Sequence, residues 1–88
     1  MPRVEIYSTL FCGYCARAKS LLEAKGIDYI EIDVMADTEK RTEMIHRTGG
    51  RRTVPQIFVD SRHVGGWEEL YALERQGKLD GLLEGAAR

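Results

Sequence analysis

The chain has 88 residues, of which 43% are hydrophobic and 31% charged, an ordinary globular composition that fits one domain over residues 1–88 and excludes a disordered tail. Its 13 Lys and Arg against 14 Asp and Glu leave a formal charge of −1, which argues against nucleic-acid binding through a broad basic face. No apolar run is longer than Leu70–Leu73, which is too short for a membrane span, and the first residues lack the apolar stretch of a signal peptide, so the expected location is the cytoplasm.

Changes between alternating and helical spacing of apolar residues predict the elements in chain order. They are a strand over residues 3–8, a helix over 13–25 that Gly26 ends, a strand over 27–33, a helix capped by Asp37 or Thr38 that runs through Arg47, a strand over 56–60, a short strand over 63–65, a helix from Trp67 that Gly77 ends, and one or two last helical turns near Leu79, Leu82 and Leu83.

The resulting order, β-α-β-α-β-β-α, indicates an α/β fold with a four-stranded mixed sheet flanked by helices. A β-α-β unit implies a right-handed crossover between parallel strands, and the two later strands form an antiparallel hairpin through the tight connection at Ser61 and Arg62.

Two cysteines, Cys12 and Cys15, stand where the first strand leads into the first helix. At that position unpaired backbone N–H groups and the helix dipole stabilise a thiolate on Cys12, while Cys15 lies one turn further on and is more buried. The spacing supplies an exposed attacking thiolate and a resolving thiol, which thiol–disulfide exchange requires.

Other interpretations of these residues stay open at this point. The cysteines could be two unrelated core residues, or half of a zinc site shared between two chains, since two cysteines alone complete neither a disulfide framework nor a four-ligand site. His46 and His63 stand at no spacing tied to the cysteines and are interpreted as surface or turn histidines.

Three separated motifs make the chain resemble a glutaredoxin of the short bacterial class over nearly its whole length. They are Cys12-Gly13-Tyr14-Cys15, which follows the strand Val4-Glu5-Ile6-Tyr7 and leads into Ala16-Arg17-Ala18-Lys19, then Thr53-Val54-Pro55-Gln56-Ile57-Phe58-Val59-Asp60, and Gly65-Gly66 before Trp67-Glu68-Glu69-Leu70.

The resemblance implies a thioredoxin-like fold in which Cys12 is the nucleophile, Cys15 is the resolving thiol and Pro55 is cis and lies against the cysteines. It also implies a glutathione site in which the Val54 backbone pairs with the cysteinyl part of glutathione and the helix after Gly65-Gly66 receives the γ-glutamyl carboxylate. The residues carried over to this site are Cys12, Tyr14, Arg52, Thr53, Val54, Pro55, Gly66, Trp67 and Glu68. For Gly65-Gly66, a plain exit from the hairpin is the simpler alternative.

The chain departs from the family pattern at three positions. Gly13 replaces the first proline of the common C-P-Y-C motif, Thr9 stands where a basic residue is common, and Trp67 is bulkier than the usual small residue and either packs on the core or walls the glutathione site. The glycyl carboxylate of glutathione then needs another cation, for which Arg17, Arg51 and Arg52 are candidates and the Arg51-Arg52 pair is favoured because it flanks the groove.

The leading functional interpretation is a monomeric enzyme, a glutathione-dependent oxidoreductase that reduces protein disulfides and glutathionylated proteins. An alternative or additional activity is a homodimer that carries a [2Fe–2S] cluster on Cys12 of each chain and two glutathione thiolates, which Gly13 favours; no other metal site is expected. A thioredoxin-like donor reduced by a flavoprotein is disfavoured, because Phe11 replaces the tryptophan of W-C-G-P-C and Gly65-Gly66 favours glutathione.

Overall fold

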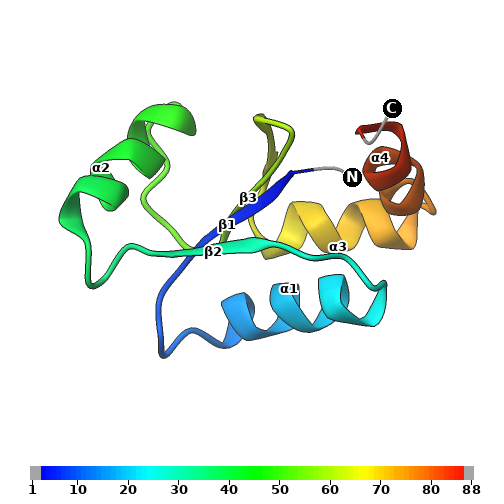
Figure 1. Cartoon of the computed structure of the whole chain (residues 1–88), viewed down its shortest axis with the longest axis horizontal. Helices are drawn as coiled ribbons and strands as arrows, with labels where there is room; N and C mark the ends of the chain where they lie inside the picture. Colours follow the sequence, from blue (N-terminus) through cyan, green and yellow to red (C-terminus); the bar gives the residue numbers. More distant parts are fainter. Residues whose placement is uncertain (1–2, 87–88) are drawn as a thin grey trace.

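Residues 3–86, which the computed structural model describes, form four strands and four helices (Figure 1). In chain order they are β1 (Val4–Ser8), α1 (Gly13–Ala24), β2 (Ile30–Asp33), α2 (Thr38–Arg47), β3 (Gln56–Val59), β4 (Arg62–Gly65), α3 (Trp67–Arg75) and α4 (Leu79–Ala86). The predicted order is confirmed, and the last predicted turns form the complete helix α4.

The strands form one mixed sheet in the order β2-β1-β3-β4. β1 pairs with β2 in parallel and with β3 antiparallel, and β3 and β4 form the predicted antiparallel hairpin. Asp60 and Ser61 turn the hairpin with positive φ angles of 49° and 69°, the left-handed geometry that matches the twist of the paired strands.

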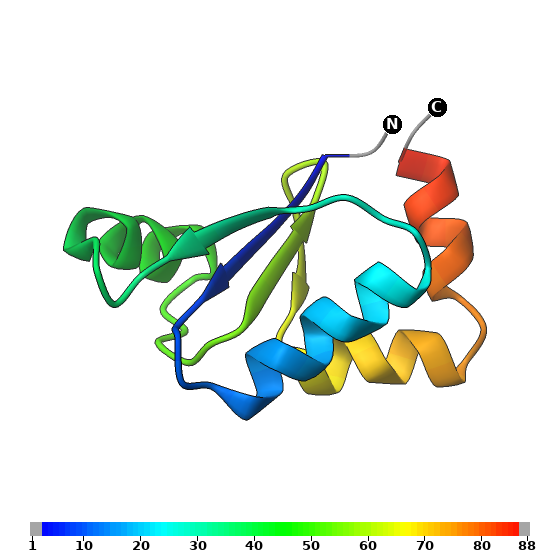
Figure 2. The same ribbon diagram turned by 60° about the horizontal axis from the view of Figure 1, so that its bottom comes forward.

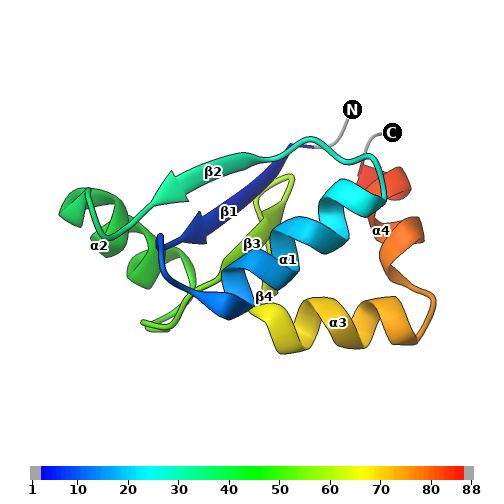
Figure 3. The same ribbon diagram turned by 90° about the horizontal axis from the view of Figure 1, so that it is seen from below.

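Helices α1 and α3 cover one face of the sheet and lie side by side, with their N-terminal ends at the same end of the molecule (Figures 2 and 3). The main core lies between them and the sheet, and α4 adds to it. Its buried members are Val4, Ile6, Ala18, Leu22, Ile57, Val59, Leu70, Leu79 and Leu83. Because both helices start beside the carboxyl end of β1, their N-terminal N–H groups converge on the region of Cys12.

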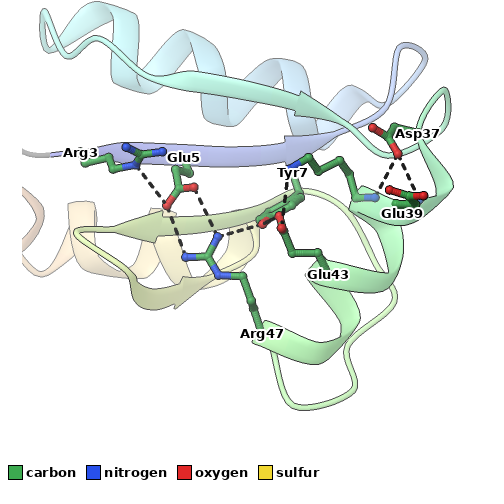
Figure 4. Close-up of polar contacts among 8 residues, drawn as sticks. Arg3, Glu5, Tyr7, Asp37, Glu39, Glu43 and Arg47 are labelled. Atoms are coloured by element: carbon green, nitrogen blue, oxygen red, sulfur yellow. Dashed lines mark hydrogen bonds and ion pairs between the residues drawn. The ribbon is translucent and has the colours of Figure 1, made fainter.

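Helix α2 covers part of the opposite face through a small second core and a polar network (Figure 4). The Tyr7 hydroxyl donates to Glu43 at 2.5 Å and accepts from Arg47 at 2.8 Å. The Arg47 guanidinium also donates to Glu5 at 3.3 Å and lies over the Phe58 ring, 3.9 Å from its centroid. These contacts supply partners for the polar groups of Glu5 and Tyr7, so α2 can cover this side of β1 without leaving them unpaired.

All five residues of β1 are buried, including Glu5, which accepts from Arg47 of α2, and Ser8, which donates to Glu31 at 2.7 Å. One strand boundary needs correction. The second strand starts at Ile30 and not at residue 27, because Ile27 continues the turn after α1, its N–H donating to the Leu22 carbonyl at 3.0 Å.

Smaller predictions about the ends of elements hold. Gly26 follows α1 with a φ of +69°, as predicted for the residue that ends the helix. Asp37 caps α2, accepting from Glu39 N at 3.1 Å and Lys40 N at 3.2 Å. Among residues 3–86, no helix has both the length and the apolar character needed to cross a membrane.

Candidate functional site

Cys12 is the N-cap residue of α1 and leads directly into the helix. Its backbone is extended (φ −116°, ψ 114°), its carbonyl accepts from Ala16 N at 3.1 Å, and its Sγ accepts from Cys15 N at 3.2 Å. The sulfur therefore occupies the place of a capping oxygen and meets an N–H group that the helix leaves unpaired. Negative charge on Cys12 Sγ is stabilised there by this N–H group and by the helix dipole.

The two thiols differ in access. Both cysteines are free; Cys12 is partly exposed, whereas Cys15 is fully buried. Burial, followed by the hydrogen bond to Cys12, raises the pKa of Cys15 from 9.0 to about 12, so Cys15 stays protonated near neutral pH. The helix thus presents one thiol and protects the other.

The segment before β3 lies against Cys12. The Val54–Pro55 peptide bond is cis, as the resemblance implied, and the Cys12 Sγ–Val54 O distance is 3.8 Å. Residues far apart in the chain, the first cysteine and the Val54 carbonyl, therefore share one site.

A cleft of about 320 Å³ opens beside this contact. Its lining comes from the start of α1, the segment before β3 and the start of α3, and comprises Tyr14, Arg51, Thr53, Val54, Pro55, Gly66, Trp67, Glu68 and Glu69. Most of the residues carried over by the resemblance are thus brought together, with Cys12 at the Val54 edge of the cleft. A larger hollow of about 860 Å³ lies over α2 and β2, but its lining lacks Val54, the residue that lies against Cys12, so we place the thiol chemistry at the smaller cleft.

Of the three candidate arginines, only Arg51 lines the cleft. Arg51 lines the cleft and donates to Glu69 at 2.9 Å, whereas Arg52 is exposed and is absent from the lining. Arg17 lies over the Tyr14 ring, 5.5 Å from its centroid, and is also absent from the lining. The arrangement therefore favours Arg51 as the cation of the cleft.

Gly65 and Gly66 do more than end the hairpin. Gly65 has a φ of +127°, and a Cβ atom added there would lie 2.5 Å from the Glu69 carboxylate; one added at Gly66 would lie 3.1 Å from the Pro55 carbonyl. Glu69 accepts from Gly66 N at 2.7 Å, and this bond together with Arg51 lowers the pKa of the Glu69 carboxyl. The pair of glycines lets the N-terminus of α3 pack directly against the segment that carries Pro55.

Trp67 packs on the core, one of the two alternatives predicted for it, and also lines the cleft. Its side chain is half-buried and packs against the main core, stacks on Tyr71 with ring centroids 5.1 Å apart, and lines the cleft. On the other wall Tyr14 is largely exposed, as are Leu10 and Phe11 before Cys12. The cleft is therefore framed by aromatic side chains from α1 and α3.

The sequence did not mark Gln56 as a site residue, and it predicted His63 to be a surface or turn histidine; His63 is exposed on β4. Gln56 is fully buried, donates to the Thr53 carbonyl and hydroxyl, and accepts from His63 at 2.7 Å. A polar residue inside a buried apolar run was the available signal, but one of its partners, His63, lies on another strand. His46 is exposed on α2. Within residues 3–86, no group of three or more His, Cys, Asp or Glu side chains could hold a metal ion.

Comparisons with known proteins agree with this arrangement. The family model described as glutaredoxin matches residues 4–64. Glutaredoxin 3 of Escherichia coli is 51% identical over 84 residues, covering 96% of this chain and all of the relative. The solution structure of glutaredoxin from Brucella melitensis has a TM-score of 0.83 and 53% identity, covering 98% of this chain and 91% of the other. A buckwheat glutaredoxin–glutathione complex has a TM-score of 0.88 and 29% identity, covering 98% of this chain and 80% of the other.

Proposed function

The chain belongs to the glutaredoxin family and is a glutathione-dependent thiol–disulfide oxidoreductase, and we propose that Cys12 carries its chemistry with Cys15 as the resolving thiol. The observation that carries this assignment is the position of Cys12, partly exposed at the N-terminus of α1 and at the edge of the cleft. Cys15 is buried and holds its proton, so it enters the reaction only once the first disulfide has formed.

With a glutathionylated protein, the Cys12 thiolate attacks the glutathionyl sulfur. The substrate S–S bond breaks, a Cys12–glutathione disulfide forms, and the released protein thiolate takes a proton from solvent. A glutathione thiolate then attacks the glutathionyl sulfur, releasing oxidised glutathione and restoring the Cys12 thiolate. The protein substrate gains two electrons, and two glutathione units leave as one disulfide.

With a protein disulfide, Cys12 attacks one sulfur and releases the other as a thiol. Cys15 then loses its proton and attacks Cys12 Sγ, which releases the second substrate thiol and leaves a Cys12–Cys15 disulfide. Two glutathione molecules reduce that disulfide in turn. The resolving thiol acts within the same molecule and so at a high effective concentration, which matters most for this substrate class.

We propose that glutathione lies in the cleft with its cysteinyl backbone along Val54 and its γ-glutamyl carboxylate at the start of α3, near Gly66, Trp67 and Glu68. Arg51, in place of Arg52, would meet the glycyl carboxylate, and Tyr14 would flank the tripeptide. The shared lining of the cleft by these residues supports this pose, as does the likeness to a glutaredoxin whose structure contains glutathione.

The direct test compares Cys12→Ser and Cys15→Ser on two substrates, a glutathionylated peptide and a protein disulfide, with oxidised glutathione measured as product. We expect Cys12→Ser to abolish turnover of both, and Cys15→Ser to retain turnover of the glutathionylated peptide. A folded Cys15→Ser protein without activity on that peptide would contradict the assigned roles.

A second candidate function is carriage of a [2Fe–2S] cluster between two copies of the chain. The donor set fits only such a shared arrangement, because one chain offers a single accessible thiol and these clusters are held by four thiolates, here Cys12 of each copy and two glutathione molecules. The observation that favours it is the free space at Gly13, where an added Cβ atom would meet nothing within 4 Å. Proline would fill part of that space beside Cys12.

Anaerobic reconstitution with iron, sulfide and glutathione, followed by absorption and gel filtration, tests this second function. We expect a coloured dimer from the wild type and none from Cys12→Ser, with Cys15 dispensable. A colourless monomer from the wild type would reject the function. A coloured dimer that also forms from Gly13→Pro would support cluster binding but would show that it does not depend on the free space at Gly13.

We also propose that the chain acts in the cytoplasm as a single-domain monomer, with glutathionylated or disulfide-bonded proteins as its partners. The supporting argument is chemical, since the cycle consumes reduced glutathione and free protein thiols are kept in that compartment.

A further inference from the structure

Gln56 is a fully buried amide that begins β3 directly after Pro55. Its Nε2 donates to the Thr53 carbonyl at 3.0 Å and to the Thr53 hydroxyl at 3.2 Å, and its Oε1 pairs with His63 Nε2 at 2.7 Å. Every polar atom of this side chain is therefore used. A buried amide persists in an apolar strand only with such partners, so these three bonds form one unit.

The chemistry of Thr53 determines the direction of the whole chain of bonds. A carbonyl oxygen can only accept, so the amide nitrogen of Gln56 must face Thr53 and its oxygen must face His63. His63 must then donate from Nε2. Partial burial and the nearby Arg51 lower the pKa of His63, and the Nε2 donor is in place whether or not Nδ1 also carries a proton.

The register of the β3–β4 hairpin places His63 on the same face of the sheet as Gln56. The two-residue turn at Asp60 and Ser61 pairs Val59 with Arg62 and Phe58 with His63. Residues that stand opposite each other in a ladder point to the same face, and Gln56, two residues before Phe58, shares that face. The His63 ring lies 5.0 Å from the Phe58 ring, and the extra residue of β4, Val64, comes after it.

The hydrogen bonds from His63 through Gln56 end at the Thr53–Val54 peptide, which lines the cleft. A trans peptide is planar, so the direction of the Thr53 carbonyl also determines the direction of the Val54 N–H group. Thr53 and Val54 both line the cleft, and the Val54 carbonyl lies 3.8 Å from Cys12 Sγ. Holding one carbonyl therefore orients the backbone groups beside the reacting sulfur.

We propose that His63 is a positioning residue for glutathione binding, acting through Gln56 to orient the Thr53–Val54 peptide of the cleft. The inference rests on the proposed function of that cleft and adds a residue on the far strand of the hairpin.

Two substitutions of His63 separate this role from a packing role. His63→Phe keeps a ring against Phe58 and removes the donor, whereas His63→Gln removes the ring and keeps a donor at about the same reach. We expect His63→Phe to raise KM for a glutathionylated peptide about fivefold, the effect of about one lost hydrogen bond, with kcat changed less than about twofold. His63→Gln should stay within about twofold of the wild type. Arg62→Gln, on the same strand, is the control and should match the wild type.

A second pair of variants covers the case in which His63→Phe does not fold. Gln56→Met keeps the length of the side chain but removes its bonds to Thr53 and His63, and should raise KM by a similar factor. The double variant Gln56→Met/His63→Phe, where it folds, should be no worse than Gln56→Met alone, because both act through one chain of bonds. Equal KM values for wild type and His63→Phe, or for wild type and Gln56→Met, would overturn the proposal, as would His63→Gln impaired as much as His63→Phe.

A measurement without substrate separates this inference from the proposed function. The carbonyl ¹³C resonance of Thr53 responds to the hydrogen bond that it accepts, so it should move in His63→Phe and Gln56→Met and stay near its wild-type position in His63→Gln. Resonances that do not move would reject the positioning role even if the enzyme is active. If the Thr53 resonance moves in these variants as expected, but the wild-type protein does not turn over glutathionylated peptide, only the proposed function is rejected.

Discussion

Replacing Arg51 by alanine should weaken glutathione binding, whereas the same change at Arg52 should not. Arg51 lies in the cleft with its guanidinium 2.9 Å from Glu69, and their side chains are 41% and 42% exposed. Glutathione carries a net negative charge, and the Glu69 carboxylate shares the cleft. Arg51→Ala therefore removes an attractive charge and leaves a repulsive one.

The magnitude follows from the exposure of the pair. A hydrogen bond to a charged group is worth about 1.5–3 kcal/mol, but solvent screens a site that is two-fifths exposed, so we take about 1–1.4 kcal/mol. That corresponds to a rise in KM for a glutathionylated peptide of about five- to tenfold. Arg51→Lys keeps the charge without the planar fork and should give an intermediate KM.

The assay measures steady-state KM at two salt concentrations. Arg52→Ala is the matched control, because it makes the same change in net charge one residue away and outside the cleft lining. We expect its KM within about twofold of the wild type. At the higher salt concentration the difference in KM between Arg51→Ala and Arg52→Ala should be smaller, because salt screens the charge of Arg51. Equal KM values for Arg51→Ala and Arg52→Ala, or an unchanged KM in Arg51→Ala, would show that Arg51 is not the cation that binds glutathione in the cleft.

Three further predictions concern the cysteines. Limiting iodoacetamide near neutral pH should modify Cys12 before Cys15, because only Cys12 is accessible and stands at the helix end; peptide mass mapping that finds Cys15 modified first would reverse the roles. Cys12→Ser should melt within a few degrees of the wild type while losing activity, since the thiol is partly exposed and serine also caps helices; a large loss of stability would mean that Cys12 is structural. The folded pKa of Cys15 is about 12 against 9.0 for the free thiol, so above pH 9 the unfolded state loses this proton first, and the free energy of unfolding should fall by up to about 1.4 kcal/mol per pH unit towards pH 12. Urea unfolding under reducing conditions should show a shallower fall in Cys15→Ser, and identical slopes would contradict the shift.

Local signals were sufficient for much of this fold. Helix starts, the strand-to-helix placement of Cys12 and the end of α1 at Gly26 all follow from neighbouring residues, and the structure has them as predicted. The burial of Glu5 in β1 has a tertiary cause that the sequence pattern does not contain. Helix α2 covers that side of the strand, and its Arg47 supplies the partner that lets Glu5 be buried.

The parts of the site that escaped prediction depend on register. Nothing in the order of residues distinguishes Arg51 from Arg52 as the one that faces α3, because a loop lacks the periodicity of a helix or strand. His63 stands opposite Phe58 and beside Gln56 because the hairpin turns at Asp60 and Ser61; a turn one residue later, at the predicted Ser61 and Arg62, would place His63 opposite Asp60. Such contacts require the paired strands to be seen together.

The most direct test of the central claim is to trap the covalent intermediate. Cys15→Ser protein, which lacks the resolving thiol, is mixed with one equivalent of glutathionylated peptide, quenched with acid and analysed by peptide mass mapping. We expect a disulfide-bound glutathionyl group on the peptide that contains Cys12, formed as the substrate thiol is released. Release of the substrate thiol with no glutathione on Cys12, or transfer of the substrate peptide itself to Cys12, would contradict it.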